Sequence, residues 1–370
     1  MKTIAAFPER REVKLVDVPG PGEPDPGQVR LRMREVGICG TDHEIAHFAY
    51  GEPPEGADHL ILGHEALAEV EAVGGGVTAF HVGDFVAPMV RRPCPHKRCR
   101  SCRAGRQDFC FTGDFTESGI KGKHGFMSEA CVEDPAYLVP VPAELARYGV
   151  LVEPLSIAEK GLQQVWQVQQ RLPWSCEPRA EREKAWCHRA VVLGAGPIGM
   201  LGAMALVTAG FETYVYSREA ADSPRAGLVS AFEAEYVCSE ETGLDELASD
   251  LGEIDVVYEA TGVSWLAFAA LERLGINGVF ILTGIPGEKG PEEVESARIM
   301  RRLVLQNQVI FGTVNAGRSA HEDAVRDLQR FSRQWPEALD GLITARIGLE
   351  DVPDTLRERG GGIKTVVSIA

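Results

Sequence analysis

Residues 189–209 read RAVVLGAGPIGMLGAMALVTA, and this stretch decides the fold of the second half of the chain. It contains a six-residue G-x-G-x-x-G pattern, preceded by a β-type run at 190–193 and followed by an Ala-rich apolar run at 198–208. A strand, a tight glycine turn and a helix in this order bind the pyrophosphate of a dinucleotide at the helix N-terminus. A glycine-rich turn without a ligand is the alternative. We predict a dinucleotide site at Gly194, Gly196, Pro197, Ile198 and Gly199.

The sequence after this turn alternates strand-like and helical runs. A helical run falls at 265–273, and strand-like runs fall at 213–216, 255–258, 279–282 and 309–311. Such alternation is typical of a parallel, doubly wound sheet. The first 160 residues differ, because proline and glycine separate short strand-like runs at 13–18, 29–36, 63–73 and 82–90. We therefore predict an α/β protein with a β-rich first part, a polar linker at 173–189 and a doubly wound second part.

The end of the second strand of this sheet decides which dinucleotide binds. A carboxylate at that point accepts a hydrogen bond from the ribose 2′-OH of NAD. In this chain the run ends in Ser217-Arg218, and a guanidinium complements the 2′-phosphate of NADP. Arg225 is a second candidate cation. We predict NADP, and NAD is the alternative if Glu219 binds the 2′-OH while Arg218 is only a surface charge.

Four of the nine cysteines crowd into residues 94–110 with the spacing C-x4-C-x2-C-x7-C. Because the start of the chain lacks a secretory signal, this crowding indicates metal binding in a reducing cytoplasm rather than disulfides. Four thiolates complete a tetrahedral zinc shell and leave no position open for a reaction. Free thiols and an iron–sulfur cluster are the alternatives. We predict a structural zinc site at Cys94, Cys99, Cys102 and Cys110.

Cys39 and His64 form a second, dispersed candidate site. A lone cysteine is usually a small buried hydrophobe, and a lone histidine is usually a satisfied polar group. Together the two suggest a catalytic zinc with three protein ligands and one exchangeable position. A carboxylate must then supply the third ligand, and Glu65 and Glu153 are both candidates.

The composition excludes several classes of protein. Hydrophobic residues make up 44% of the chain and charged residues 25%, which is an ordinary globular balance. The formal net charge is −16, so the chain is a poor candidate for binding the phosphate backbone of nucleic acids. No apolar run is long enough to predict a membrane span.

At these residues the chain resembles the zinc-dependent medium-chain dehydrogenase/reductase superfamily, and within it the glucose dehydrogenase branch. The resemblance covers nearly the whole chain. The spacing of the four cysteines is similar to that of the glucose dehydrogenases, as are the segments 153–157 and 311–315. The superfamily signature is visible as Gly63-His64-Glu65 followed by Val70, Val73, Gly74, Val77, Gly83-Asp84 and Val86.

The resemblance implies roles for individual residues. Cys39 and His64, with Glu65 or Glu153, would hold the catalytic zinc, and Thr41 would contact the reacting oxygen. Sugar hydroxyls would be bound by Glu117, Glu153 and Asn315. Lys364 would reach the cofactor phosphates. The loops beside the nicotinamide would be formed by Leu282, Thr283, Gly284, Thr313 and Val314.

The resemblance also implies an architecture and an activity. We expect a β-rich, GroES-like, zinc-binding catalytic domain from residues 1–172 and 317–370, and a Rossmann domain from residues 173–316. The expected reaction transfers a hydride from C1 of an aldose, D-glucose above all, to NADP and yields the lactone. A small sugar is then the partner, together with one catalytic and one structural zinc, in a homodimer or homotetramer.

Two departures from the branch keep another zinc-dependent polyol or alcohol dehydrogenase as the alternative. Ile157 stands where some relatives carry an aspartate that contacts the sugar, and Ala68 replaces a glycine. A protein of a different class, which binds NADP without catalysis, would be expected to lose catalytic residues. The chain retains all of them, namely Cys39, Thr41, His64, Glu65 and Glu153.

Overall fold

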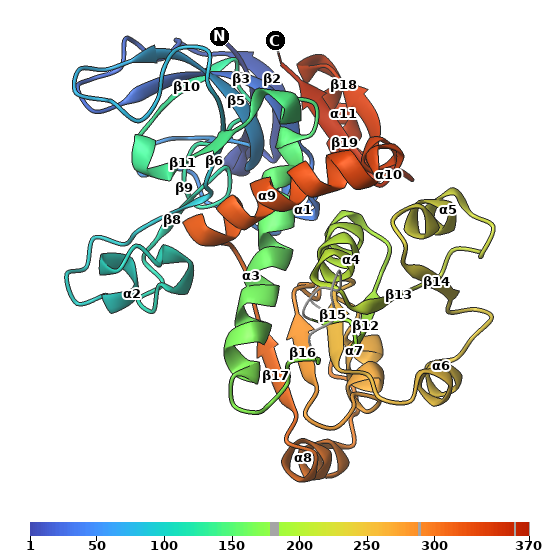
Figure 1. Ribbon diagram of the computed structural model, residues 1–370. Coiled ribbons are helices and arrows are strands. Elements are labelled where there is room, and N and C mark those ends of the chain that lie inside the picture. The colour runs from blue at the N-terminus through green and yellow to red at the C-terminus, as the bar shows by residue number, and fades with distance from the viewer. Residues whose placement is uncertain (178–184, 288–289, 359, 370) are drawn as a thin grey trace. The chain divides into compact units, whose positions relative to one another are not determined.

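The computed structural model describes residues 1–177, 185–287, 290–358 and 360–369, and the chain divides into two compact units (Figure 1). Unit 1 comprises Met1–Ser156, Asn315–Gln329 and Leu342–Ala370, and unit 2 comprises Ile157–Val314 and Arg330–Gly341. The expected boundaries were 172/173 and 316/317. The difference arises because most of helix α3 (Val152–Gln169) belongs to unit 2, where its Gly161 approaches the side chains of Tyr258 and Ile281.

Unit 2 is built on a parallel six-stranded sheet with the strand order β14-β13-β12-β15-β16-β17. The order reverses between β12 and β15, which is the switch point where doubly wound sheets bind ligands. The predicted doubly wound sheet is therefore confirmed. In chain order the strands are β12 (Arg189–Leu193), β13 (Glu212–Ser217), β14 (Glu235–Cys238), β15 (Val256–Glu259), β16 (Val279–Leu282) and β17 (Val309–Gly312).

Helices cover the sheet of unit 2, and α4 packs against β12 and β13. The sequence analysis found α4 and α7 but not the others. The helices are α4 (Pro197–Ala209), α5 (Pro224–Ala231), α6 (Leu244–Leu251), α7 (Ser264–Leu271), α8 (Ser296–Leu305) and most of α10 (Pro336–Leu342).

Unit 1 is β-rich, as predicted. Its largest sheet has the order β11-β6-β5-β3-β19-β18. Strand β19 pairs with residues 35–37 of β3, and β10 pairs with residues 29–32 of the same strand. The sheet brings the last strand of the chain beside a strand of the first forty residues. Its strands are β3 (Val29–Gly37), β5 (Glu65–Val73), β6 (Phe85–Pro88), β10 (Ala130–Glu133), β11 (Leu138–Val141), β18 (Ile343–Ile347) and β19 (Lys364–Ser368).

Two smaller sheets complete unit 1. The first has the order β2-β1-β4 and consists of β1 (Lys2–Phe7), β2 (Glu12–Asp17) and β4 (Leu60–Ile61). The second has the order β7-β8-β9 and consists of β7 (Arg91–Arg92), β8 (Thr116–Ser118) and β9 (Gly122–Lys123).

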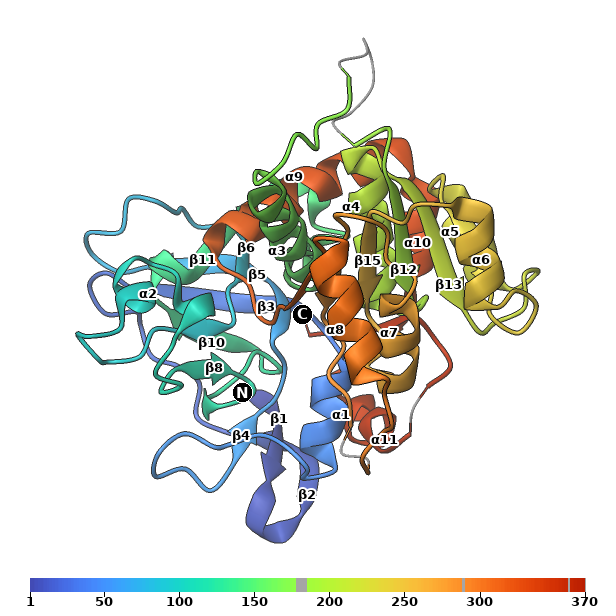
Figure 2. The same cartoon turned by 90° about the horizontal axis from the view of Figure 1, so that it is seen from below.

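The helices of unit 1 are mostly short, and α1 packs against α11 (Figure 2). They are α1 (Gly40–Ala46), α2 (Arg100–Arg103), α11 (Val352–Arg357) and the first part of α9 (Arg318–Gln334). Single 3-10 turns lie at Pro8–Arg10, Gln107–Phe109, Pro135–Tyr137, Ala143–Leu145, Gly149–Leu151 and Leu349–Asp351. Within the described residues, no helix combines the length and apolarity that a membrane crossing requires.

Substitutions at two glycines of the dinucleotide turn should affect folding and dinucleotide binding separately. A Cβ on Gly199 would overlap the carbonyl oxygen of Gly194, so we predict that Gly199→Ala lowers the free energy of unfolding by about 1–3 kcal/mol. A Cβ on Gly196 would meet no heavy atom within 4 Å. Gly196→Ala should therefore preserve stability but weaken dinucleotide binding roughly tenfold or more, because the methyl group keeps the pyrophosphate from the backbone.

Chemical denaturation and nucleotide titration of both variants check this prediction. Similar losses of stability and of affinity in the two variants would contradict it.

Candidate active site

Three potential metal ligands converge in unit 1. The Cys39 sulfur, one ring nitrogen of His64 and one carboxylate oxygen of Glu65 lie within 4.8 Å of one another. Cys39 caps helix α1, and the two other residues stand at the start of β5. His64 and Glu65 are buried. A thiolate, an imidazole and a carboxylate form a donor set that zinc accepts.

Strand pairing brings this cluster together. Gly37, the last residue of β3, pairs with Glu65 on one side and with Val366 of β19 on the other. A Cβ on Gly37 would collide with the Glu65 carboxylate and would lie 2.8 Å from Cε of Lys364. The missing side chain therefore leaves the space in which the two charged groups meet.

Asp42 and His64 polarise one another beside the cluster. The Asp42 carboxylate is fully buried, accepts hydrogen bonds from the backbone N–H groups of Cys39 (2.9 Å) and Gly63 (3.3 Å), and lies 3.7 Å from Nδ1 of His64. Burial opposes both charges, but the attraction between them lowers the pKa of Asp42 and raises the pKa of His64 well above its usual value. Sequence analysis missed Asp42, although its position three residues after the helix cap is a capping signal.

The buried donor atoms fit a metal ion. Among the described residues, Nδ1 of His64 has no hydrogen-bond partner, and Glu65 is a buried carboxylate. Thr41 lies in the first turn of α1 and is partly buried, two residues beyond Cys39.

Glu153, at the start of α3, is the second carboxylate of this site. Burial raises its pKa to about 7; Glu65 and Glu117 act in the same direction, and His64 and Lys364 oppose them. The 3-10 turn Gly149–Leu151 just before Glu153 packs against β5, which starts at Glu65, although Glu153 is not one of the three mutually close donors. Both carboxylates therefore stay candidates for the third ligand position.

Glu117 and Asn315 meet in the same unit, although 198 residues separate them in sequence. The Asn315 amide donates to Oε1 of Glu117 at 3.4 Å. Its own Oδ1 is buried and accepts no hydrogen bond from any described residue. Asn315 adopts a left-handed backbone conformation with φ of 56°, which asparagine tolerates better than most residues. The pair presents carboxylate and amide oxygens suited to hydroxyl groups.

The four clustered cysteines also come together. Their sulfur atoms lie within 4.8 Å of one another. Burial acts against the thiolate form, but hydrogen bonds from Thr112 and Gly113 lower the pKa of Cys110 to about 6. The side chains of Lys97, Arg98, Arg100 and Arg103 are exposed in the same segment and would offset the charge of a tetrathiolate site. The geometry fits a closed zinc site.

Two other cysteines are joined in a disulfide. Cys176 pairs with Cys187 across a Cα–Cα distance of 5.8 Å, within the segment predicted as a linker. No disulfide was expected in this chain. The linker residues 178–184 lie outside the described residues.

The dinucleotide turn of unit 2 has the expected form. Helix α4 starts at Pro197 after the cap residue Gly196, so its first backbone N–H groups are available to an anion. Arg218 follows β13, and its side chain is exposed. Glu219 is already engaged, because its carboxylate accepts from the Ser217 hydroxyl at 2.7 Å and lies 3.4 Å from Arg225. This arrangement favours Arg218 over Glu219 as the group that receives the ribose.

Glu259 at the end of β15 organises the neighbouring loops and was not predicted. Its buried carboxylate accepts from the backbone N–H groups of Thr261 (2.6 Å), Gly262 (2.8 Å) and Gly284 (3.2 Å). Its carbonyl accepts from the Thr283 hydroxyl. Leu282, Thr283 and Gly284 thus stand at the carboxyl edge of the sheet, where doubly wound folds bind ligands.

Thr313 and Val314 follow the adjacent strand β17. Lys160 of α3 donates to the Val314 carbonyl at 3.0 Å, and Gln164 donates to the Thr313 hydroxyl at 3.1 Å. Helix α3 therefore fixes this second loop.

Lys364, which was expected at the cofactor phosphates, lies beside Glu65 in unit 1. Lys364 is only 2% exposed, pairs with Glu65 and donates to the Ile38 carbonyl at 2.9 Å. Burial lowers its pKa, but Glu65 and Cys39 outweigh that effect and keep the ammonium charged. This placement arises because β19 starts beside Gly37, and its first residue, Lys364, is buried in unit 1.

Comparisons with known proteins agree with this geometry. A family model described as "Glucose dehydrogenase C-terminus" matches residues 146–369, and an "Alcohol dehydrogenase GroES-like domain" model matches residues 25–143. A glucose 1-dehydrogenase of Methanocella arvoryzae is 39% identical over 370 residues and covers 100% of this chain and 99% of its own. One of Haloarcula marismortui is 37% identical and covers 99% of both chains.

A solved structure matches equally well. The glucose dehydrogenase of Haloferax mediterranei in complex with NADP, Zn and gluconolactone has a TM-score of 0.88 and 31% identity, over 100% of this chain and 99% of the other.

Removal of the Lys364 charge distinguishes a role beside Glu65 from the predicted role at the cofactor phosphates. Lys364→Met leaves Glu65 buried without its cation, so we predict a loss of about 3–5 kcal/mol in the free energy of unfolding of the metal-free protein. Added zinc should restore part of this loss, because a divalent cation replaces the ammonium charge. NADP affinity should stay within about twofold of wild type.

Lys14→Met, at an exposed ion pair, is the control and should cost less than about 1 kcal/mol. Urea unfolding and a nucleotide titration supply the readouts. A large loss of NADP affinity with unchanged stability would restore the phosphate-binding role.

Proposed function

Because the chain belongs to the glucose dehydrogenase family of zinc-dependent medium-chain dehydrogenases, we propose that it oxidises D-glucose at C1 to the lactone and reduces NADP. The observation that carries this proposal is the presence of two groups in unit 1: the donors Cys39, His64 and Glu65, and the hydroxyl-binding pair Glu117 and Asn315. The chain segments of the two groups touch, because a Cβ on Gly119, two residues after Glu117, would collide with the carbonyl oxygen of Gly63, which precedes His64.

The donor residues suit a reactive zinc. Cys39 and His64 would hold the ion, with Glu65 or Glu153 as the third ligand. When bound, zinc supplies a Lewis acid that lowers the pKa of a substrate hydroxyl. Asp42, whose carboxylate lies 3.7 Å from Nδ1 of His64, would orient the imidazole, which binds zinc in its neutral form. In this proposal the Thr41 hydroxyl, in the first turn of α1, would carry the released proton away from the sugar.

We assign sugar specificity to buried polar side chains that would form hydrogen bonds with the hydroxyl groups of the substrate. Glu117, Glu153 and Asn315 are buried polar groups, and a substrate without the matching hydroxyls leaves them unpaired. Simple alcohols are therefore poor substrates. Another polyol stays the second candidate, because Ala68 and Ile157 depart from the family pattern.

NADP belongs to unit 2 in this proposal. Gly194, Gly196 and Gly199 accept the pyrophosphate with Pro197 and Ile198, and Arg218 with Ser217 receives the ribose phosphate. The loops 282–284 and 313–314 line the nicotinamide. NAD is the weaker alternative cofactor.

The four-cysteine site is assigned to a structural zinc, which has no open position. Reduced thiols are required there, which favours the cytoplasm as the compartment, whereas the Cys176–Cys187 disulfide is typical of an oxidising one; our assignment follows the four-cysteine site. A net charge of −16 argues against nucleic acid as a partner.

The enzyme should contain two zinc ions of different lability. Brief chelation should remove the ion at Cys39 and His64, because its shell is open, and should abolish NADP reduction by glucose while the fold and the second zinc persist. Metal analysis and circular dichroism follow the two ions and the fold. The activity panel compares aldoses, polyols and simple alcohols with NADP and with NAD. Activity that outlasts loss of this metal, or a polyol preferred over glucose, would contradict the proposal.

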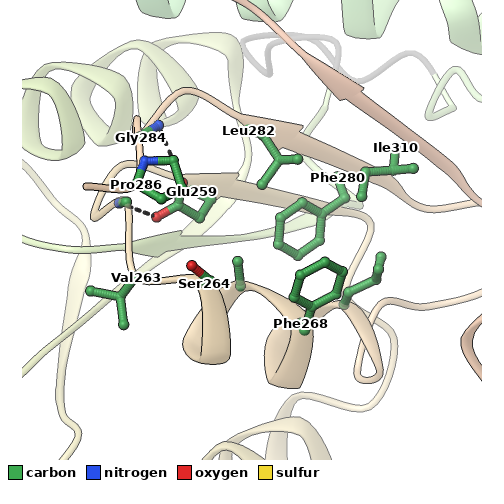
Figure 3. Close-up of a pocket in the computed structure, with 12 residues that line it drawn as sticks. Glu259, Val263, Ser264, Phe268, Phe280, Leu282, Gly284, Pro286 and Ile310 are labelled. Carbon is green, nitrogen blue, oxygen red and sulfur yellow. Dashed lines mark hydrogen bonds between the residues drawn. The ribbon is translucent and has the colours of Figure 1, made fainter. Parts of the chain in front are cut away.

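We further propose that unit 2 forms a homodimer. Strand β17 is the last strand of its sheet, and an open edge is a template for pairing with an identical edge across a two-fold axis. An apolar pocket lies beside it, lined by Val263, Phe268, Leu271, Phe280, Leu282 and Ile310 (Figure 3). Met300, Val304 and Leu305 of α8 in the same unit are each more than 60% exposed. Exposed apolar surface of this kind is typical of a subunit interface.

Light scattering after gel filtration tests the dimer. Ile310→Lys should give a monomer, because a buried ammonium in the interface lacks a partner. Val82→Lys, at an exposed apolar residue of unit 1, should leave the dimer intact. A monomeric wild-type protein at micromolar concentration would rule the proposal out, whereas a tetramer that Ile310→Lys splits would extend it.

A further inference from the structure

Arg91 forms a buried ion pair with the sugar-binding carboxylate. Arg91 and Glu117 face each other across the antiparallel strands β7 and β8, and each is only 6% exposed. Nε of Arg91 donates to Oε1 of Glu117 at 3.0 Å, and Nη2 lies 2.9 Å from the same oxygen. Asn315 donates to the same oxygen. Oε2 of Glu117 accepts no hydrogen bond from any described residue, so it is the oxygen left for a ligand.

Two further contacts fix the guanidinium itself. Its carbon lies 3.7 Å from the centroid of the Phe115 ring, and Nη1 donates to the Asp108 carbonyl at 3.2 Å. Asp108 lies two residues before Cys110, so the four-cysteine lobe supplies this acceptor. Arg91 therefore joins the structural lobe to the sugar contact.

We propose that Arg91 is a positioning residue that sets substrate specificity: it fixes the orientation of the Glu117 carboxylate and turns Oε2 toward one sugar hydroxyl. This inference rests on the proposed function. A planar guanidinium stacks on the ring and donates to both acceptors at once, whereas the ammonium of a lysine is a point charge on a flexible chain that cannot hold these contacts together. A positive charge alone is therefore insufficient to orient Glu117. Arg91→Lys tests this point, because it keeps the charge and removes the fixed contacts of the guanidinium.

The neighbouring residue is a matched control. Arg92 also pairs with a buried carboxylate, donating from Nη2 to Oε2 of Glu133 at 2.9 Å. It also donates to a backbone carbonyl, that of Met89, and stacks on an aromatic ring, that of Tyr137. Glu133 is outside the proposed site. Arg92→Lys thus makes the same chemical change next to Arg91 without touching Glu117.

The experiment measures kcat and KM of the zinc-loaded enzyme for glucose and for 2-, 3-, 4- and 6-deoxyglucose. We expect Arg91→Lys to raise the KM for glucose roughly tenfold or more while kcat changes less than about threefold, because a charge-assisted contact is misaligned. Arg92→Lys should alter both constants less than about twofold. One deoxy sugar, which lacks the hydroxyl held by Oε2, should bind Arg91→Lys and wild type alike.

Glu117→Gln separates failure of this inference from failure of the proposed function. The deoxy sugar that lacks the hydroxyl held by Oε2 should also bind Glu117→Gln and wild type alike. If Glu117→Gln shows that pattern but Arg91→Lys does not, Arg91 has no positioning role and the proposed function stands. If no sugar cancels the effect of Glu117→Gln, the sugar contact itself is wrong.

A second variant covers the case in which Arg91→Lys does not fold. Phe115→Leu removes only the ring beneath the guanidinium and should raise the KM for glucose by about three- to tenfold, with the same deoxy sugar unaffected. Equal losses for all sugars, or an effect on kcat alone, would overturn the inference.

Discussion

The chemistry of unit 1 depends on one constraint: an ionisable group buried away from water needs an opposite charge beside it. Glu65 and Lys364 meet this constraint at the point where three strands of the large sheet come together. Gly37 provides the space, since any side chain there would collide with both groups. Asp42 and His64 form a second buried pair of ionisable groups next to Glu65. The charges that would hold a metal are thus part of the packing of the sheet.

A second buried pair, Arg91 with Glu117, extends the same principle to the sugar contact. It is held on the small sheet, and the segment that carries the four cysteines supplies one acceptor to it, the Asp108 carbonyl. The lobe therefore has a function beyond local stability in this account, because it fixes the orientation of a group that contacts substrate. In unit 2 the buried Glu259 carboxylate fixes two loops, because it accepts hydrogen bonds from backbone N–H groups of both.

Local sequence patterns predicted the parts of the molecule that depend on neighbours along the chain. The glycine turn at 194–199 and the four cysteines at 94–110 are such parts, and the resemblance to a family added Glu117 and Asn315. Partners brought together by strand pairing could not be predicted, because no local pattern records that Lys364 lies beside Glu65 or Arg91 beside Glu117. The same reason explains the boundary within α3, where packing of Gly161 on the second sheet decides the assignment.

The central claim is that Cys39, His64 and a neighbouring carboxylate hold a zinc ion distinct from the one at the four cysteines. Anomalous diffraction at the zinc edge from crystals of the zinc-loaded protein tests it most directly. The account predicts two peaks, one among the sulfurs of residues 94–110 and one bounded by Cys39, His64 and Glu65 or Glu153. Crystals of an active preparation with a peak only at the four cysteines would contradict it.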